Sequence, residues 1–361
     1  MEKILVTKPS IAPYEEYAEE IKSIWDTMHI TNFGPKYQKF IGMLKEKFGY
    51  EFIDCQCNGH MALQNILSTI PEGEIITTPF TFVSTTLAIK NSGHTPVFCD
   101  INEEDYNIDV SKIEELITDK TVAIVPVHVY GSPCDVDEIE RIAKKHNLKV
   151  VYDAAHAFAE KINGKEIGKY GDASMFSFHA TKVYNTIEGG LCVLKTEQML
   201  EEVKNRSNFG ILDGITEYDG VNSKMNEFAA AMGIVNLKYL DESIEKRKEI
   251  TKIYDEALKD IECIKIRDLK DNVDYNYAYY PIFITDEKKG ADDLTEYLQK
   301  HDIYPRRYFY PAINDMPIFE SKQDTPIARK IAKNILCLPI YADLSYEDTQ
   351  RIAGIIKEYY E

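Results

Sequence analysis

The chain has 361 residues, enough for roughly two domains. Hydrophobic residues make up 44% of it and charged residues 28%, as in a globular protein with a sizeable core, which excludes a disordered chain or a fibre. The 42 basic and 60 acidic residues give a net charge of −18, so we expect neither nucleic acid nor a membrane surface as a partner. A small anionic ligand is still compatible with this charge, because it needs only a few local cations and N–H groups.

The cysteines and the hydrophobic pattern indicate a cytoplasmic protein. The seven cysteines are odd in number and lie mostly in apolar runs, as buried free thiols of a reducing compartment do. Cys55 and Cys57 have no second Cys or His pair at zinc-site spacing, so no metal is expected. The N-terminal residues MEKILVTKPS lack the apolar core of a signal peptide, and no window approaches the ~20 apolar residues of a membrane span.

From about residue 50 onward, short apolar runs alternate with turns and amphipathic stretches. The pattern predicts strands at 74–78, 96–100, 122–129 and 148–153, separated by helices near 81–91, 110–117 and 136–146. The apolar runs are β-branched and barely alternate with polar residues, which is typical of strands buried on both faces. We therefore predict an α/β fold with a mainly parallel sheet.

Two more strands are predicted at 173–178 and 190–194, and after them the alternation of strands and helices ends. A long helical region with a bend follows at 222–258, and the remainder shows a strand at 277–284 and helices at 291–301, 327–334 and 346–360. We predict a large domain over residues 1–240 and a smaller C-terminal α+β domain over residues 241–361.

The turn Asn58-Gly59 is the first candidate for ligand binding. Ligands of open α/β sheets bind beyond the carboxyl ends of the strands, and this turn leads directly into an apolar helical pattern. The unpaired N–H groups of a helix start bind anions, and a glycine lets a phosphate approach the backbone. The alternative is a plain turn and helix cap. Neither G-x-G-x-x-G nor G-x-x-x-x-G-K-[ST] occurs in the chain.

Two further stretches carry an acid and an amine. Asp153 ends an apolar strand before Ala154-Ala155-His156, so it is either a helix N-cap or the counter-ion of a protonated ligand nitrogen, with room for a flat ring beside the small alanines. Lys182 follows the aromatic run at 176–178 and precedes Glu188-Gly189-Gly190. It is either a solvated surface residue or a partly desolvated amine, and desolvation would lower its pKa toward that of a Schiff-base nucleophile.

A fourth stretch, 220–227, is on its own only a capped helix start. Together and in this order, the stretches resemble the DegT-like family of pyridoxal-phosphate-dependent nucleotide-sugar aminotransferases, which have the aspartate-aminotransferase-like fold (fold type I). The resemblance covers about residues 25–235. Its segments are TNFGP at 31–35, Asn58-Gly59, PFTF at 79–82, DAAH at 153–156, Gly171-Asp172, FSFHATK at 176–182 with Glu188-Gly189-Gly190, and NSKMNE at 222–227.

This resemblance implies roles for residues around the cofactor, pyridoxal 5'-phosphate. Lys182 would form the Schiff base with the cofactor and move protons during amino transfer. Asp153 would pair with the pyridinium nitrogen, His156 would lie near the ring hydroxyl, and Phe82 would stack on one ring face.

The resemblance also implies a phosphate site and a partner. Gly59 and Ser177 would hold the phosphate, together with His60, at whose position the family usually has Thr or Ser. Asn222 would reach the phosphate of the neighbouring subunit's cofactor, which implies a homodimer with shared active sites.

The substrate implied is a nucleotide-linked keto-sugar, with L-glutamate as the amino donor, in deoxysugar biosynthesis such as that of an O-antigen. Relatives with His in place of the lysine are dehydratases, so Lys182 favours transamination. The pair HATK and Glu188-Gly189-Gly190 is closer to enzymes that aminate C4 of dTDP-4-keto-6-deoxyglucose than to 3-keto-sugar enzymes, which more often have Pro-Gly-Lys and an Asp before the Gly pair. The alternatives are amination at C3, a UDP- or GDP-linked sugar, and a non-catalytic binding protein.

Candidate substrate residues come from two parts of the chain. Glu188 would line the sugar pocket, and the diphosphate needs cations, for which Lys224, Arg306 and Arg307 are candidates. The segment from Arg306 through Tyr308 to residue 311 is where the C-terminal third loosely resembles the family.

Overall fold

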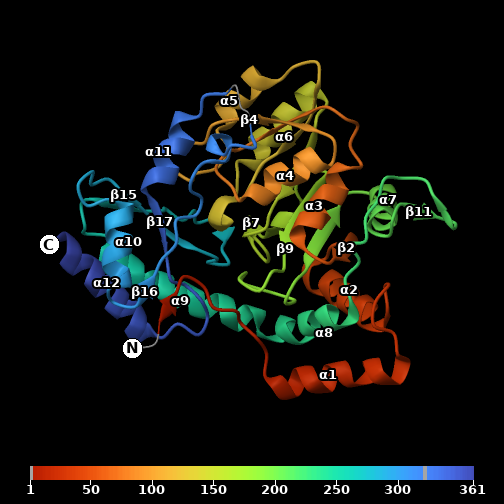
Figure 1. Ribbon diagram of the computed structural model, residues 1–361, viewed down its shortest axis with the longest axis horizontal. Coiled ribbons are helices and arrows are strands. Elements are labelled where there is room, and N and C mark those ends of the chain that lie inside the picture. The colour runs from red at the N-terminus through yellow and green to blue at the C-terminus, as the bar shows by residue number, and fades with distance from the viewer. Residues whose placement is uncertain (1–2, 320–322) are drawn as a thin grey trace.

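A seven-stranded sheet forms the centre of the computed structural model, which describes residues 3–319 and 323–361 (Figure 1). Its strand order is β2-β10-β9-β6-β5-β3-β4, and β10 alone among the described strands of this sheet runs against its neighbours. The strands are β2 (Phe52–Gln56), β3 (Glu74–Thr77), β4 (Thr95–Phe98), β5 (Thr121–Val125), β6 (Lys149–Asp153), β9 (Ala173–Ser177) and β10 (Gly190–Leu194). The predicted α/β fold with a mainly parallel sheet is confirmed.

Helices cover both faces of this sheet, because successive strand residues point to opposite faces. Ile75 and Ala123 belong to an apolar core shared with α3 (Gly59–Leu67), α4 (Val83–Asn91) and α7 (Glu197–Ser207). Their chain neighbours Ile76 and Ile124 belong to a second, larger core on the opposite face. Helices that contribute to the larger core include α2 (Pro35–Phe48), α5 (Val110–Ile113), α6 (Val136–His146) and α8 (Glu227–Asn236).

The C-terminal part of the chain has an apolar core of its own. Its antiparallel sheet has the order β13-β15-β17. The elements are α9 (Leu240–Leu258), β13 (Ile264–Ile266), β15 (Tyr280–Ile284), α10 (Ala291–Gln299), β16 (Ile303–Tyr304), α11 (Pro326–Asn334), β17 (Ile335–Leu338) and α12 (Tyr346–Tyr360). The start of the chain lies with this part, because β1 (Ile4–Leu5) pairs in parallel with β16.

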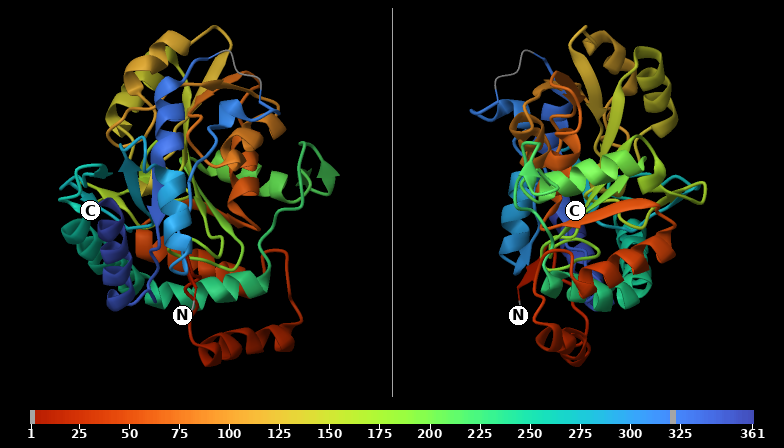
Figure 2. Two further views of the ribbon diagram at one scale, coloured as in Figure 1. Left: turned by 60° about the vertical axis from the view of Figure 1, so that its left-hand side comes forward. Right: turned by 90° about the vertical axis from the view of Figure 1, so that its right-hand side faces the viewer.

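Two elements project from the body of the molecule (Figure 2). The first is α1 (Tyr14–Thr27), which packs on α8 and leaves Trp25 and Met28 exposed. The second is the hairpin of β11 (Ile211–Leu212) and β12 (Ile215–Thr216), in which Leu212 and Ile215 are exposed. A small sheet of β14 (Val273–Asp274), β7 (Lys161–Ile162) and β8 (Lys165–Glu166) completes the fold. Within the described ranges, we find no helix with the length and apolar character needed to cross a membrane.

One predicted strand is wrong at its end. The strand expected at 122–129 stops at Val125 as β5. The chain then leaves the sheet through an isolated bridge between Val127 and Asp153 and forms a tight turn at Val129–Gly131. Pro126 marks the change, because proline has no N–H to donate to a sheet ladder.

Candidate active site

A cavity of about 290 Å³ lies where the carboxyl ends of β2, β3, β6 and β9 meet the segment at 306–309. Carboxyl ends of parallel strands converge at one edge of a sheet, which is why stretches far apart in the chain meet here. The predicted residues that line the cavity are Gly59, His60, Phe82, Asp153, His156, Ser177, Lys182, Glu188, Arg306 and Tyr308.

Asp153 is a buried carboxylate held by two hydrogen bonds. Thr85 Oγ1 donates to one of its oxygens at 2.7 Å, and the Ala155 N–H donates to the other at 3.0 Å. Burial raises the pKa of Asp153, while these two bonds and the charge of Lys182 oppose the rise. The arrangement provides a fixed acceptor for a proton carried by a ligand.

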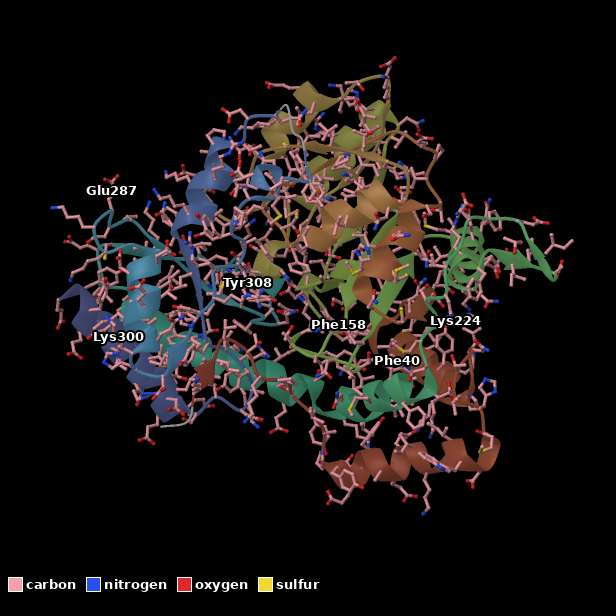
Figure 3. The ribbon with its side chains drawn as sticks, in the orientation of Figure 1. Phe40, Phe158, Lys224, Glu287, Lys300 and Tyr308 are labelled. Carbon is pink, nitrogen blue, oxygen red and sulfur yellow. The ribbon has the colours of Figure 1, made fainter. Side chains whose placement is uncertain are left out.

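Lys182 lies in the loop that follows β9, and aromatic packing in the core fixes the start of this loop. The ring centroid of Phe178, the residue after β9, lies 4.8 Å from that of Phe158 and 6.2 Å from that of Phe40. Figure 3 labels Phe158 and Phe40. The Lys182 Nζ donates to the Tyr279 hydroxyl at 3.4 Å. Burial lowers the pKa of Lys182 to about 8, against the opposing charge of Asp153. A larger fraction of this amine is therefore neutral and nucleophilic near pH 7 than for a surface lysine.

The first turn of α3 forms a cradle for an anion. Asn58 caps the helix by accepting the Met61 N–H at 2.8 Å, and the preceding N–H groups have no acceptor within the helix. A Cβ on Gly59 would lie 3.2 Å from Ser177 Cα, and one on Gly190 would lie 2.5 Å from Asn58 O. Glycine is therefore required at Gly190, and at Gly59 a side chain would force its neighbours to shift by a few tenths of an ångström.

His60 and Ser84 flank this cradle. His60 Nδ1 lies 2.9 Å from Ser84 Oγ, and burial lowers the pKa of His60. The predicted phosphate ligand Ser177 ends β9 on the other side, where its Oγ accepts the His179 N–H at 3.4 Å. Hydroxyl, imidazole and backbone donors thus surround one small volume, as anion binding requires.

Phe82 and His156 offer surfaces to a flat ring. The Phe82 side chain precedes α4 and is 53% exposed although it lines the cavity, so its ring face is free for stacking. His156 Nδ1 accepts the Tyr130 N–H at 3.1 Å, which leaves Nε2 as the protonated donor of the ring. Burial lowers the pKa of His156 well below its ordinary value, so it stays neutral.

Three predicted residues lie outside this cavity. Arg307 does not line the cavity, because its guanidinium donates to Ala332 O and Lys333 O and pairs with Asp292. Lys224 Nζ donates to Asn208 and Asn222 on the hairpin side, and Figure 3 shows Lys224 well apart from Tyr308. Neither Lys224 nor Asn222 lines the cavity that this chain forms on its own.

The chain matches the DegT/DnrJ/EryC1/StrS aminotransferase family over residues 13–357. It belongs to this family. The dTDP-4-amino-4,6-dideoxy-D-glucose transaminase of Shigella dysenteriae is 40% identical over 365 residues, which is 99% of this chain and 100% of that protein. The protein of the same name from Escherichia coli is 40% identical over 364 residues, or 98% of each chain.

Solved structures agree with this family membership. A crystal structure of DesI in the presence of its TDP-sugar product superposes with a TM-score of 0.94 at 29% identity, covering 99% of this chain and 93% of that one. The superposition includes both the central sheet and the C-terminal part. The fold of this chain is therefore that of a sugar aminotransferase along its described length.

Sequence reasoning missed several residues of this aminotransferase site. Tyr279, Thr85 and Ser84 contact or line the cavity, but no motif marks them. Phe309 also lines the cavity, and it lies inside the segment at 306–311 that loosely resembles the family. Ser84 and Thr85 lie in the helix that follows the PFTF segment, so the start of that helix was the available signal. Tyr279 is one of 24 tyrosines, and its position next to Lys182 depends on the packing of the C-terminal part.

Proposed function

We propose that this chain is a pyridoxal-phosphate-dependent aminotransferase that converts dTDP-4-keto-6-deoxyglucose to dTDP-4-amino-4,6-dideoxyglucose, with L-glutamate as donor, in the cytoplasm. The observation that carries the proposal is the single cleft shared by Asp153, Lys182 and the anion cradle at Gly59. The names of the relatives at 40% identity support the choice of sugar and of C4.

The residues of the cleft fit this cofactor in charge and shape. A phosphate suits the cradle between Gly59 and Ser177, where an added Cβ on Gly59 would lie only 3.1 Å from Ser177 Cβ. A pyridine ring suits the free face of Phe82, and its protonated nitrogen suits the Asp153 carboxylate. An aldehyde suits the Lys182 amine, whose pKa burial lowers. His60 supplies an imidazole donor where relatives usually have a hydroxyl.

When bound, pyridoxal phosphate supplies an electron-poor ring that stabilises negative charge on the substrate carbon beside the transferred nitrogen. Asp153 would keep a proton on the ring nitrogen, because a buried carboxylate is stabilised by a cation. Lys182 Nζ would carry a proton between the substrate carbon and the cofactor carbon, for which a pKa near the working pH is favourable. His156, whose Nδ1 accepts the Tyr130 N–H, would donate from Nε2 to the ring oxygen.

Substrate groups are proposed to meet the mouth of the cleft. Arg306 lies over the Tyr308 ring, 4.4 Å from its centroid, and supplies a cation for the diphosphate. Glu188 pairs with His179 at 3.5 Å and is still more than half exposed. We propose that the Glu188 carboxylate accepts hydrogen bonds from the hydroxyl groups of the sugar.

We propose a homodimer in which Asn222 and Lys224 act in the partner's site. Both residues stand outside the cavity of their own chain, beside the projecting hairpin. Exposed apolar residues lie close to this segment: the exposed Phe209 ring lies under Lys224, and the exposed Ile30 accepts the N–H of Glu227, at the start of α8, through its carbonyl. An exposed apolar region of this kind is typical of a subunit interface.

One experiment distinguishes this substrate from the alternatives. Purified protein is incubated with L-glutamate and a panel of dTDP-, UDP- and GDP-linked 3-keto and 4-keto sugars, and NMR locates the new amine. Amination at C4 of the dTDP sugar is expected, and amination at C3 or of another nucleotide sugar contradicts this proposal. A colourless protein that is unaffected by added cofactor supports a non-catalytic binding protein instead.

A further inference from the structure

Tyr279 is a residue of the cleft to which the cofactor and substrate assignments give no role. It precedes β15 and is only 6% exposed, yet its hydroxyl lies 3.4 Å from Lys182 Nζ and accepts a hydrogen bond from it. Its ring packs 4.6 Å from the His156 ring and 5.5 Å from the Tyr308 ring. The hydroxyl is therefore held beside the amine by rings on two sides.

Arg247 supports the backbone that carries Tyr279. This arginine of α9 is fully buried, and no carboxylate pairs with it among the residues that the structure describes. Its guanidinium donates to Ile340 O at 3.2 Å and to Ala278 O, directly before Tyr279, at 3.5 Å. A buried cation without a carboxylate is costly, so its position indicates a function. Burial raises the pKa of Tyr279, and the charge of Arg247 opposes the rise.

We propose that Tyr279 is a catalytic residue whose hydroxyl holds Lys182 Nζ in place for proton transfer whenever the amine is free, and that Arg247 positions this tyrosine. The proposal rests on the proposed function, in which Lys182 Nζ accepts a proton from the substrate carbon. The resulting ammonium has three N–H bonds, and Tyr279 Oη accepts one of them. No covalent bond of Tyr279 forms or breaks, and in each half of the reaction Nζ would pass the proton on between the substrate carbon and the cofactor carbon.

The variant Tyr279→Phe tests the role of the hydroxyl, because it keeps the ring and its packing. We expect kcat to fall by about tenfold or more while KM for both substrates is unchanged, since the hydroxyl acts in proton transfer rather than in binding. Tyr277→Phe is the matched control, because it removes a phenol two residues away that does not line the cavity. An unchanged kcat in Tyr279→Phe overturns the proposal.

A double-mutant cycle tests the role of Arg247. If Arg247 acts through Tyr279, the single variant Arg247→Lys should have a lower kcat. The same substitution should cause no further loss of kcat in a chain that already has Tyr279→Phe. Losses that add in the double variant contradict the positioning role. Circular dichroism of each variant reports whether the fold is retained.

A measurement without turnover separates this proposal from the proposed function. Cofactor-free full-length protein is treated with acetic anhydride over a pH series, and mass spectrometry follows acetylation of Lys182. The midpoint is expected near pH 8 in the unmodified chain, where burial places the pKa of Lys182. Tyr279→Phe should lower it by about one pH unit, the scale of one hydrogen bond to a charged group. An unchanged midpoint overturns the proposal whatever the protein's substrate.

Discussion

Asp153 and Lys182 reach the same cleft from adjacent parallel strands. Asp153 is the last residue of β6, Lys182 follows the end of β9, and the two strands pair directly through Val151 and Ala173. The acid is held by hydrogen bonds from Thr85 and Ala155, and the amine by its hydrogen bond to Tyr279. A fixed carboxylate and a fixed amine in one cleft suit an enzyme that would bind a protonated ring nitrogen with the acid and move protons with the amine.

Thr85 should set the acid limb of the pH profile. Its hydroxyl stabilises the charged form of Asp153, so Thr85→Val should raise the pKa of that carboxyl further above its ordinary value. Activity that needs the carboxylate is lost as pH falls through this pKa, so the acid limb should move to higher pH by about one unit. The measurement is kcat/KM against pH.

The controls for Thr85 come from the same helix. Thr85→Ser should restore the profile, because it keeps the hydroxyl. The buried Thr86 hydroxyl has no hydrogen-bond partner in the part of the chain that the structure describes, so Thr86→Val should leave the acid limb in place. A shift of equal size in both valine variants would show that the effect comes from packing.

Arg306 and Arg307 should behave differently although they are neighbours. Arg306→Ala should raise KM for the nucleotide sugar by roughly 10- to 100-fold, the cost of one charge-assisted bond to the diphosphate. Arg307→Ala should leave KM unchanged but lower the free energy of unfolding by about 1–2 kcal/mol, because it removes donors from the last carbonyls of α11. Steady-state kinetics and urea unfolding measure the two effects, and a higher KM in Arg307→Ala would contradict this assignment.

His128 should make the fold sensitive to acid. Burial lowers the pKa of His128 to about 3, while its Nδ1 accepts the Cys134 N–H. Below the ordinary pKa of about 6.5, the unfolded chain therefore binds a proton that the folded chain does not, and stability falls as pH decreases. Between pH 7 and pH 5 this loss amounts to about 2 kcal/mol.

The variant His128→Asn isolates this contribution. Asparagine can still accept the Cys134 N–H but does not titrate, so its unfolding free energy should fall less between pH 7 and pH 5. Urea unfolding at both pH values gives the comparison, in which the constant cost of lost packing against Tyr152 cancels. Equal losses in the two proteins would contradict the assignment.

Subunit complementation tests the shared site. Lys182→Ala and Asn222→Ala homodimers should both have low activity. Mixed dimers made by co-expression should regain activity, because one site then combines an intact Lys182 with an intact Asn222 from the other chain. If Asn222 acts within its own chain, mixing restores nothing.

Much of the site was predictable because its residues follow strand ends that the sequence marks. Asp153 and Lys182 each follow a buried run, and the parallel sheet brings such ends together. The difference between Arg306 and Arg307 was not predictable. Residue 306 pairs with Cys337 in an isolated antiparallel bridge, and successive residues of an extended chain point to opposite sides. Only the position of β17 shows which arginine faces the cleft.

The N-terminal region was missed for a different reason. The helix α1 buries only Ile24, so its apolar pattern is weak. The strands β1 and β16 have two residues each, and their pairing joins segments about 300 positions apart in the chain. Tyr279 likewise reaches Lys182 across 97 positions, which local patterns do not encode.

Borohydride reduction tests the central claim most directly. Protein incubated with pyridoxal phosphate is reduced with sodium borohydride and digested, and mass spectrometry identifies the lysine that carries the pyridoxyl group. The label is expected on Lys182, in stoichiometric amount, and should be absent from a Lys182→Ala sample. A label spread over surface lysines with Lys182 unmodified, or no label at all, would contradict the account.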